Sequence, residues 1–128
     1  MTDSVNLGEQ LRQIRDARLA AQQAAAEARI RAAYDKHERE RKAIRKFWLE
    51  YVMYVTKQIS QGVEPKPRKV PDVFVDSGYS LDTDGHRHHD LWQEMQQGAL
   101  QLGLTVHLKH GHDGMGGKSW YEISVEPA

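Results

Sequence analysis

The sequence contains no cysteine. A disulfide framework and thiolate chemistry are therefore excluded, and any metal site would have to be built from histidine and carboxylate side chains. The first residues, MTDSVNLGEQ, have neither the basic start nor the apolar run of a signal peptide. Apolar stretches of the roughly 20 residues that span a bilayer are also missing. We therefore expect a cytoplasmic protein that does not associate with membranes.

Glycine and proline are both absent between Glu9 and Gln61. This stretch consists mainly of Ala, Arg, Gln, Glu, Leu and Lys, which are good helix formers. Asn6 suits the N-cap of a helix, and Gly62 suits the position just after its end. We expect residues 1–62 to contain one long helix from about Leu7 to Gly62, about 80 Å long at 1.5 Å per residue. A two-helix hairpin is the alternative, although no turn residue supports it.

Apolar residues divide this helix into two parts. In the first part they form a heptad-like apolar row, interrupted by Arg18 and continued at Ala32, which predicts self-association with a dimer favoured. The residues expected to mediate oligomerisation are Leu7, Leu11, Ile14, Ala21, Ala25 and Ala28. In the second part, heavier side chains at helical spacing predict a broad face that packs on the C-terminal domain. They are Ile44, Phe47, Trp48, Tyr51, Val52, Val55 and Ile59.

The remaining residues indicate a small α+β domain. Residues 63–71 hold three of the four prolines and are expected to be an extended linker. In residues 72–128 we expect a short strand at 73–75, a loop at 77–85 and a helix at 89–102 that Gly103 ends. Two alternating segments, 104–108 and 121–125, then predict a β-hairpin. This β-α-β-β domain should pack on the end of the long helix, which would cover the sheet face that the domain's own helix leaves open.

A net charge of zero hides an asymmetry along the chain. Residues 1–62 hold 12 Lys and Arg against 8 Asp and Glu, whereas residues 63–128 hold 6 against 10. The two halves could attract each other within one molecule or between neighbours. The most basic stretch is 29–46, which is typical of either a solvated helix face or a surface that binds phosphates or an acidic protein. Its cations are Arg29, Arg31, Lys36, Arg39, Arg41, Lys42, Arg45 and Lys46.

Histidines and glycines cluster in the C-terminal half. The segments GHRHHD (85–90) and HLKHGHD (107–113) suggest, as a weak metal-binding hypothesis, the ligands His86, His88, His110 and His112. Their spacing matches no closed structural site, so surface histidines are favoured. The loop ends in GGKS, but residue 112 is His where a phosphate-binding loop needs Gly, and the loop joins two expected strands. A flexible hairpin tip is favoured, and a third possibility is that this tip contacts a partner through His110, His112, Met115 and Lys118.

No nucleophile, base or cofactor signature has a recognisable context, so we expect neither an enzyme nor a cofactor. The sequence favours a non-catalytic interaction protein, in which a self-associating helical stalk presents a small α+β domain to a protein partner. Such a protein would suit a phage or mobile element as an accessory or inhibitor. One alternative is a nucleic-acid-associated protein that uses the basic face 29–46. A second is a His-rich metal-binding domain.

Overall fold

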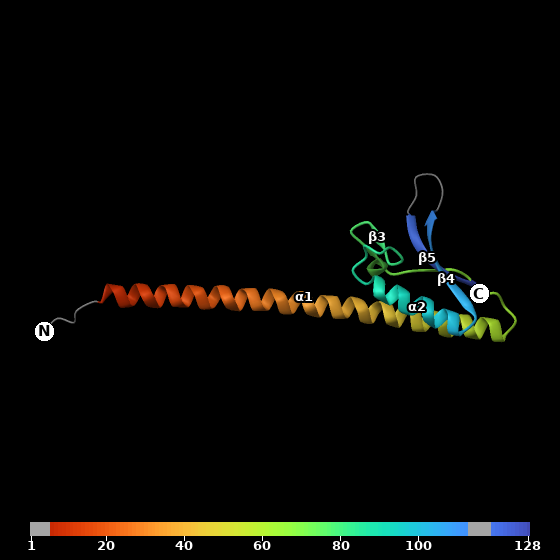
Figure 1. Cartoon of the computed structure of the whole chain (residues 1–128), viewed down its shortest axis with the longest axis horizontal. Coiled ribbons are helices and arrows are strands. Elements are labelled where there is room, and N and C mark those ends of the chain that lie inside the picture. The colour runs from red at the N-terminus through yellow and green to blue at the C-terminus, as the bar shows by residue number, and fades with distance from the viewer. Residues whose placement is uncertain (1–5, 113–118) are drawn as a thin grey trace. The chain divides into compact units, whose positions relative to one another are not determined.

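The computed structural model describes residues 6–112 and 119–128. The first element is a single α-helix, α1 (Leu7–Ser60), so the long helix predicted from the sequence is confirmed and the hairpin alternative is wrong (Figure 1). Its N-terminus is capped as expected, because the Asn6 Oδ1 accepts a 2.9 Å hydrogen bond from the Glu9 N–H. The chain divides into two compact units, an N-terminal unit (Met1–Glu38) and a C-terminal unit (Arg39–Ala128).

Gly62 ends α1 in the way that the sequence indicated. Its φ of +72° lies in the left-handed region, where glycine has no steric penalty. The N–H groups of Gly62 and Val63 bond back to the carbonyls of Ile59 and Gln58, at 3.0 and 2.8 Å. These two bonds satisfy helix carbonyls that would otherwise lack partners.

The C-terminal unit contains the last turns of α1 and every other element of the described chain. These are β1 (Arg68–Lys69), the 3-10 helix η1 (Asp72–Phe74), β2 (Val75–Asp76), β3 (Tyr79–Ser80), α2 (His89–Gln101), β4 (Leu104–His112) and β5 (Ser119–Pro127). The hairpin strands β4 and β5 are antiparallel with Val106 opposite Val125, and β1 adds to the other side of β5. The fold is therefore α+β, with a three-stranded sheet ordered β1-β5-β4 and a separate β2-β3 pair.

Two details of the predicted topology were wrong. The third strand of the sheet comes from the expected linker, where Arg68 lies opposite Ile123, and prolines at 67 and 71 limit this edge strand to two residues. Residues 73–75 are mostly 3-10 helix, and the strand that begins at Val75 pairs with β3 in the expected loop 77–85. Such short elements carry no periodicity that a sequence pattern could reveal.

The core of the C-terminal unit lies between the helices and one face of the sheet. Ile44, Tyr51 and Val55 of α1 are buried, while Trp48 is only partly covered and Ile59 is exposed. The other buried apolar residues come from the loops, α2 and the sheet, and are Phe74, Leu81, Leu91, Trp92, Met95, Ala99, Val106 and Ile123. The prediction that the second part of the long helix packs on the C-terminal domain is thereby confirmed.

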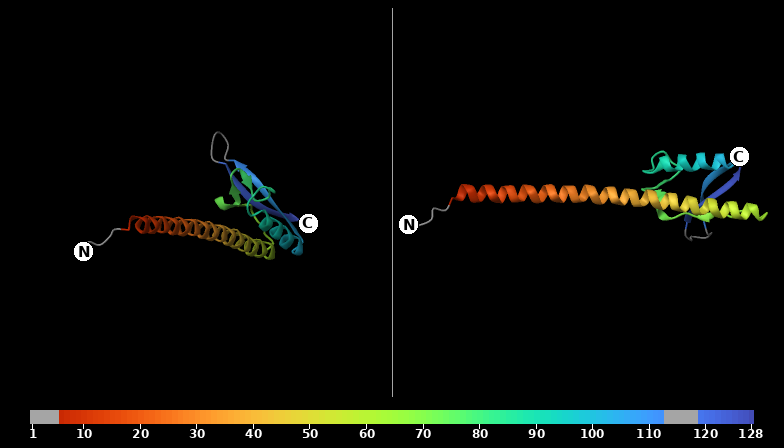
Figure 2. Two further views of the ribbon diagram at one scale, coloured as in Figure 1. Left: turned by 60° about the vertical axis from the view of Figure 1, so that its left-hand side comes forward. Right: turned by 90° about the horizontal axis from the view of Figure 1, so that it is seen from below.

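Both helices lie on the same face of the sheet, with α2 beside the C-terminal part of α1 (Figures 1 and 2). The expectation that the long helix covers the opposite face is wrong. That opposite face carries His107 and Lys109, whose side chains are 41% and 63% exposed, and no described helix covers it. Within residues 6–112 and 119–128, no helix has the length and apolar character needed to cross a membrane.

Candidate interaction surfaces

The N-terminal unit exposes almost all of its side chains. Every residue from 6 to 36 is exposed except Ala26, which is half-buried. Large apolar side chains are among those left in contact with water, namely Leu7, Leu11, Ile14, Leu19, Ile30 and Tyr34. The helical segment of the N-terminal unit therefore leaves these large apolar side chains without cover in that unit.

The residues of the apolar row share one face of this segment. Counting the position of Arg18, their spacing alternates between three and four residues, the separation of neighbours on a helix surface. Leu7 and Ile14 are 70% and 57% exposed, and Ala21, Ala25 and Ala28 are exposed as well. The structure thus places the six predicted oligomerisation residues together on an uncovered face.

The predicted basic residues divide into two groups. Arg41 donates two hydrogen bonds to Asp90 of α2, at 3.0 and 2.6 Å, and Arg45 lies 3.4 Å from Glu94 one turn later. The Arg41 hydrogen bond lowers the pKa of the Asp90 carboxyl. The other cations form no ion pair with any residue that the structure describes, and they are Arg29, Arg31, Lys36, Arg39, Lys42 and Lys46.

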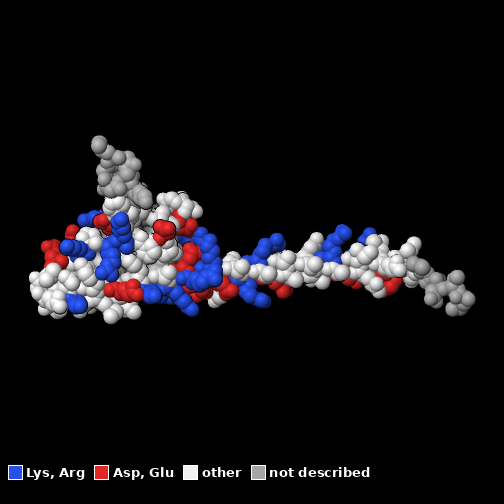
Figure 3. Space-filling model, turned by 180° about the vertical axis from the view of Figure 1, so that it is seen from behind, with Lys and Arg blue, Asp and Glu red and all other residues white. Residues whose placement is uncertain are grey.

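The pairs Arg41–Asp90 and Arg45–Glu94 help to explain the charge asymmetry of the sequence. Residues 39–62 contain six cations and two carboxylates, so they account for the whole basic excess of the first 62 residues. They lie in the C-terminal unit together with the acidic residues 63–128. Opposite charges therefore meet within one molecule, and Lys, Arg, Asp and Glu are interspersed on its surface (Figure 3).

The segment GHRHHD forms a network that joins three parts of the C-terminal unit. Arg87 donates hydrogen bonds of 2.9 and 3.0 Å to Asp76 of β2, and it also lies 3.5 Å from Glu40 of α1. The fully buried His88 ring is 3.7 Å from the second Glu40 oxygen. His89, at the start of α2, contacts Asp84 at 3.0 Å. These contacts fix the loop before α2 against α1.

His86 is also buried, with only 4% of its surface exposed. Its Nδ1 accepts a 2.9 Å hydrogen bond from the His88 N–H. Burial lowers the pKa of His86, and Arg87 acts in the same direction, while Asp76, the Val73 carbonyl and Glu40 oppose the shift. The interpretation of these histidines as surface residues is wrong for His86 and His88, because a His-rich loop sequence does not reveal its own burial.

The part of the chain that the structure describes contains no assembled metal site. No three histidines or carboxylates come together there in a way that could hold an ion. His86 and His88 lie before α2, whereas His110 lies on β4 with its ring tilted against that of Tyr121 and the ring centroids 5.2 Å apart. Of the predicted loop contacts, Met115 and Lys118 lie outside the described residues, as does the His112 side chain.

The open face of the sheet holds a group of residues that the sequence reading missed. The Lys69 ammonium lies 4.2 Å from the centre of the Trp120 ring, whose Nε1 donates a 2.5 Å hydrogen bond to Glu122. Strand alternation could have placed Trp120 on this face, opposite the buried Ile123 side. The contribution of Lys69 has no signal in the sequence, because the two residues of β1 show no alternation.

A hydroxyl, an imidazole and a carboxylate also meet on this face. Ser124 is paired with His107 across the hairpin. The His107 Nε2, however, is the atom that approaches both Thr105 Oγ1, at 3.3 Å, and Glu126, at 3.5 Å. A relay needs the two ring nitrogens to engage a carboxylate and a hydroxyl separately. This group therefore lacks the arrangement of a nucleophilic triad.

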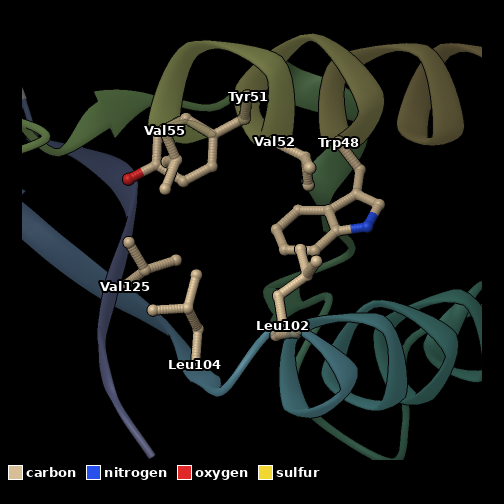
Figure 4. A pocket seen from close by; sticks show the side chains of 8 residues that line it. Trp48, Tyr51, Val52, Val55, Leu102, Leu104 and Val125 are labelled. Atoms are coloured by element: carbon tan, nitrogen blue, oxygen red, sulfur yellow. The ribbon is translucent and has the colours of Figure 1, made fainter. Parts of the chain in front are cut away.

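The cleft between the helices and the sheet is apolar (Figure 4). Its lining residues are Trp48, Tyr51, Val52, Val55, Ala99, Leu102, Leu104 and Val125. The Tyr51 hydroxyl is directed toward the Lys66 carbonyl at 3.5 Å, and burial raises the pKa of Tyr51 to about 12. The cleft has no convergent polar groups for a ligand and serves as the seam of the core.

In comparisons with known proteins, no family model, curated protein or solved structure matches the chain.

Proposed function

We propose that this protein is a non-catalytic interaction protein, in which the helical segment 7–38 mediates self-association and the α+β unit binds a macromolecular partner. The observation that carries the proposal is the exposure of this segment. Its six large apolar side chains have no cover in the N-terminal unit, and three of them, Leu7, Leu11 and Ile14, lie in the apolar row. Helices in water gain most of their stability from packing an apolar face, and this helix has such a face without anything packed on it.

The association is tested by sedimentation of the full chain over a range of concentrations. We expect an oligomer, with a dimer favoured, that Ile14→Lys converts to a monomer because it places a cation in the apolar row. The matched control is Gln23→Lys, which introduces the same charge roughly 180° away on the helix. A wild-type monomer at all concentrations, or equal behaviour of the two variants, would contradict the proposal.

The partner-binding role of the C-terminal unit is supported by its open sheet face. Lys69, Trp120 and Glu122 are clustered there, and no described helix covers them. Aromatic residues are enriched where proteins bind one another. We expect Trp120→Ser to reduce capture of a partner from host lysate without changing the oligomer, and Leu100→Ser, on the exposed side of α2, to leave capture intact.

A nucleic-acid role is the second candidate, favoured by the exposed Arg39, Lys42 and Lys46. These residues form no ion pair with the described part of the chain, unlike Arg41 and Arg45. Binding to duplex DNA should then fall steeply with salt as counterions are released. Charge reversal at Lys42 and Lys46 should abolish it, whereas Lys57→Glu should have little effect. Salt-independent binding, or none at low salt, would eliminate this candidate.

A further inference from the structure

The apolar row has a gradient of side-chain size. Its large members, Leu7, Leu11 and Ile14, come first, and the later members, Ala21, Ala25, Ala28 and Ala32, are all small. Arg18 occupies the position of the row between the large and the small residues. The row covers 26 residues, or roughly 38 Å of helix, and all of it is exposed within the N-terminal unit.

A parallel, in-register pair of these helices would match each residue with its own copy. Large residues would then meet in the first layers and alanines in the last, so the helices could not keep one separation along their length. The two Arg18 side chains would share one layer. At the flanks, Arg31 would face Lys36 of the second copy, since parallel coiled coils bring together flanking positions five residues apart.

We propose that two copies of the chain pair through this row in antiparallel orientation, with the two-fold axis crossing between Leu19 and Ala20. The spacing of the row is symmetric about that point, so every large residue of one copy meets a small residue of the other. The layers are Leu7 with Ala32, Leu11 with Ala28, Ile14 with Ala25, and Arg18 with Ala21 of the second copy.

Charges at the flanks agree with this alignment. On one side, Gln10 lies beside Arg31 of the second copy and Ala17 beside its Ala24. On the other side, Gly8 lies beside Arg29 of the second copy, and Arg15 lies beside its Gln22. No cation of the flanks faces another cation, so the antiparallel alignment avoids the repulsion of the parallel one. Because the pair has a two-fold axis, each of these contacts occurs twice in identical form, as closed dimers require.

The inference rests on the proposed self-association and adds its partner, orientation and register. Because the chain has no cysteine, introduced cysteines report contacts directly. Full-length Ile14→Cys and Ala25→Cys proteins are mixed, allowed to exchange and oxidised, and the products are identified by mass. We expect a disulfide-linked dimer with one chain of each variant, since Cα atoms within about 7 Å can be bridged. The matched control, Gln23→Cys mixed with Ile14→Cys, should give none.

The outcomes separate the inference from the function on which it rests. Sedimentation of wild type as a monomer overturns both. An oligomer in which Ala25→Cys links to itself shows a parallel pair, which overturns the inference and leaves self-association standing. An oligomer with no disulfide between positions 14 and 25 assigns the contact to another face and also overturns the inference.

Discussion

At the scale of single residues, the loop before α2 differs most from what its sequence suggested. Polar GHRHHD resembles a solvated turn, yet His86 and His88 are buried and Arg87 connects Asp76 to Glu40. The loop sequence contains the charges but not their partners, which come from β2 and α1. The partners of Arg87 are separated from it by 11 and 47 positions in the sequence, so burial that depends on them cannot be inferred from a local pattern.

Burial of His86 predicts a pH-dependent stability. The unfolded imidazole takes up a proton near its usual pKa of 6.5, whereas burial lowers the pKa of the folded group. As the pH falls through 6.5, the unfolded chain therefore gains a proton first and folding becomes less favourable. We expect the denaturant midpoint to fall between pH 7.5 and 5.5, and the fall to be smaller in His86→Gln.

The control for this measurement is His107→Gln on the open sheet face, which should keep the wild-type dependence. The carboxyls of Asp76 and Asp90 affect stability in a different pH range, because hydrogen bonds from Arg87 and Arg41 lower the pKa of these carboxyls below the usual 3.8. Their contribution is lost only in stronger acid. An unchanged slope in His86→Gln between pH 7.5 and 5.5 would show that the buried ring does not govern the effect.

Two side chains of α1 that differ in burial provide a second test. Ile44 is fully buried against α2, whereas Leu49 is 61% exposed. Ile44→Ala should lower the free energy of unfolding by roughly 2 to 5 kcal/mol, and Leu49→Ala should change it by less than about 0.5 kcal/mol. Equilibrium denaturation of both variants checks this. Equal losses would mean that the two side chains are covered alike.

At the scale of elements, long periodic segments could be predicted and short ones could not. The absence of Gly and Pro and the capping residue Asn6 indicated α1, and alternation indicated β4 and β5. The two-residue strand β1 has no alternation, and its pairing with β5 depends on a contact 55 residues away in the chain. The candidate surfaces followed the same rule: the apolar row was visible in the sequence, but the Lys69 and Trp120 contact was not.

Replacing glycine by alanine should have opposite effects on stability at a helix end and inside a helix. Gly62 has a φ of +72°, so Gly62→Ala should destabilise the protein by about 1 kcal/mol. Gly98 lies inside α2, and a Cβ there would be 3.8 Å from the Trp48 Nε1, an ordinary contact. Gly98→Ala should therefore stabilise by about 0.5 to 1 kcal/mol. Thermal unfolding of the two variants gives the signs, and a stabilising Gly62→Ala would contradict the assigned helix end.

At the scale of the whole molecule, charge and packing assign different roles to the two units. The basic stretch 39–62 is partly neutralised by α2 in the C-terminal unit, and the apolar core lies wholly in that unit. Residues 1–38 hold six cations and six carboxylates, so no net charge opposes the approach of a second copy. One chain thus combines a unit that has its own core with a helical segment whose apolar residues have no cover in their own unit.

A chain of residues 34–128 should separate these two roles. It keeps one helical turn before Arg39, so the contacts of Glu40 with Arg87 and His88 are retained. Every residue of the core cluster is present, so we expect cooperative unfolding at a denaturant midpoint close to that of the full chain. The apolar row is absent, so the shortened chain should sediment as a monomer at concentrations where the full chain is oligomeric. An oligomeric 34–128 chain would place the association in the C-terminal unit, and an unfolded one would show that residues 7–33 of the long helix stabilise the core.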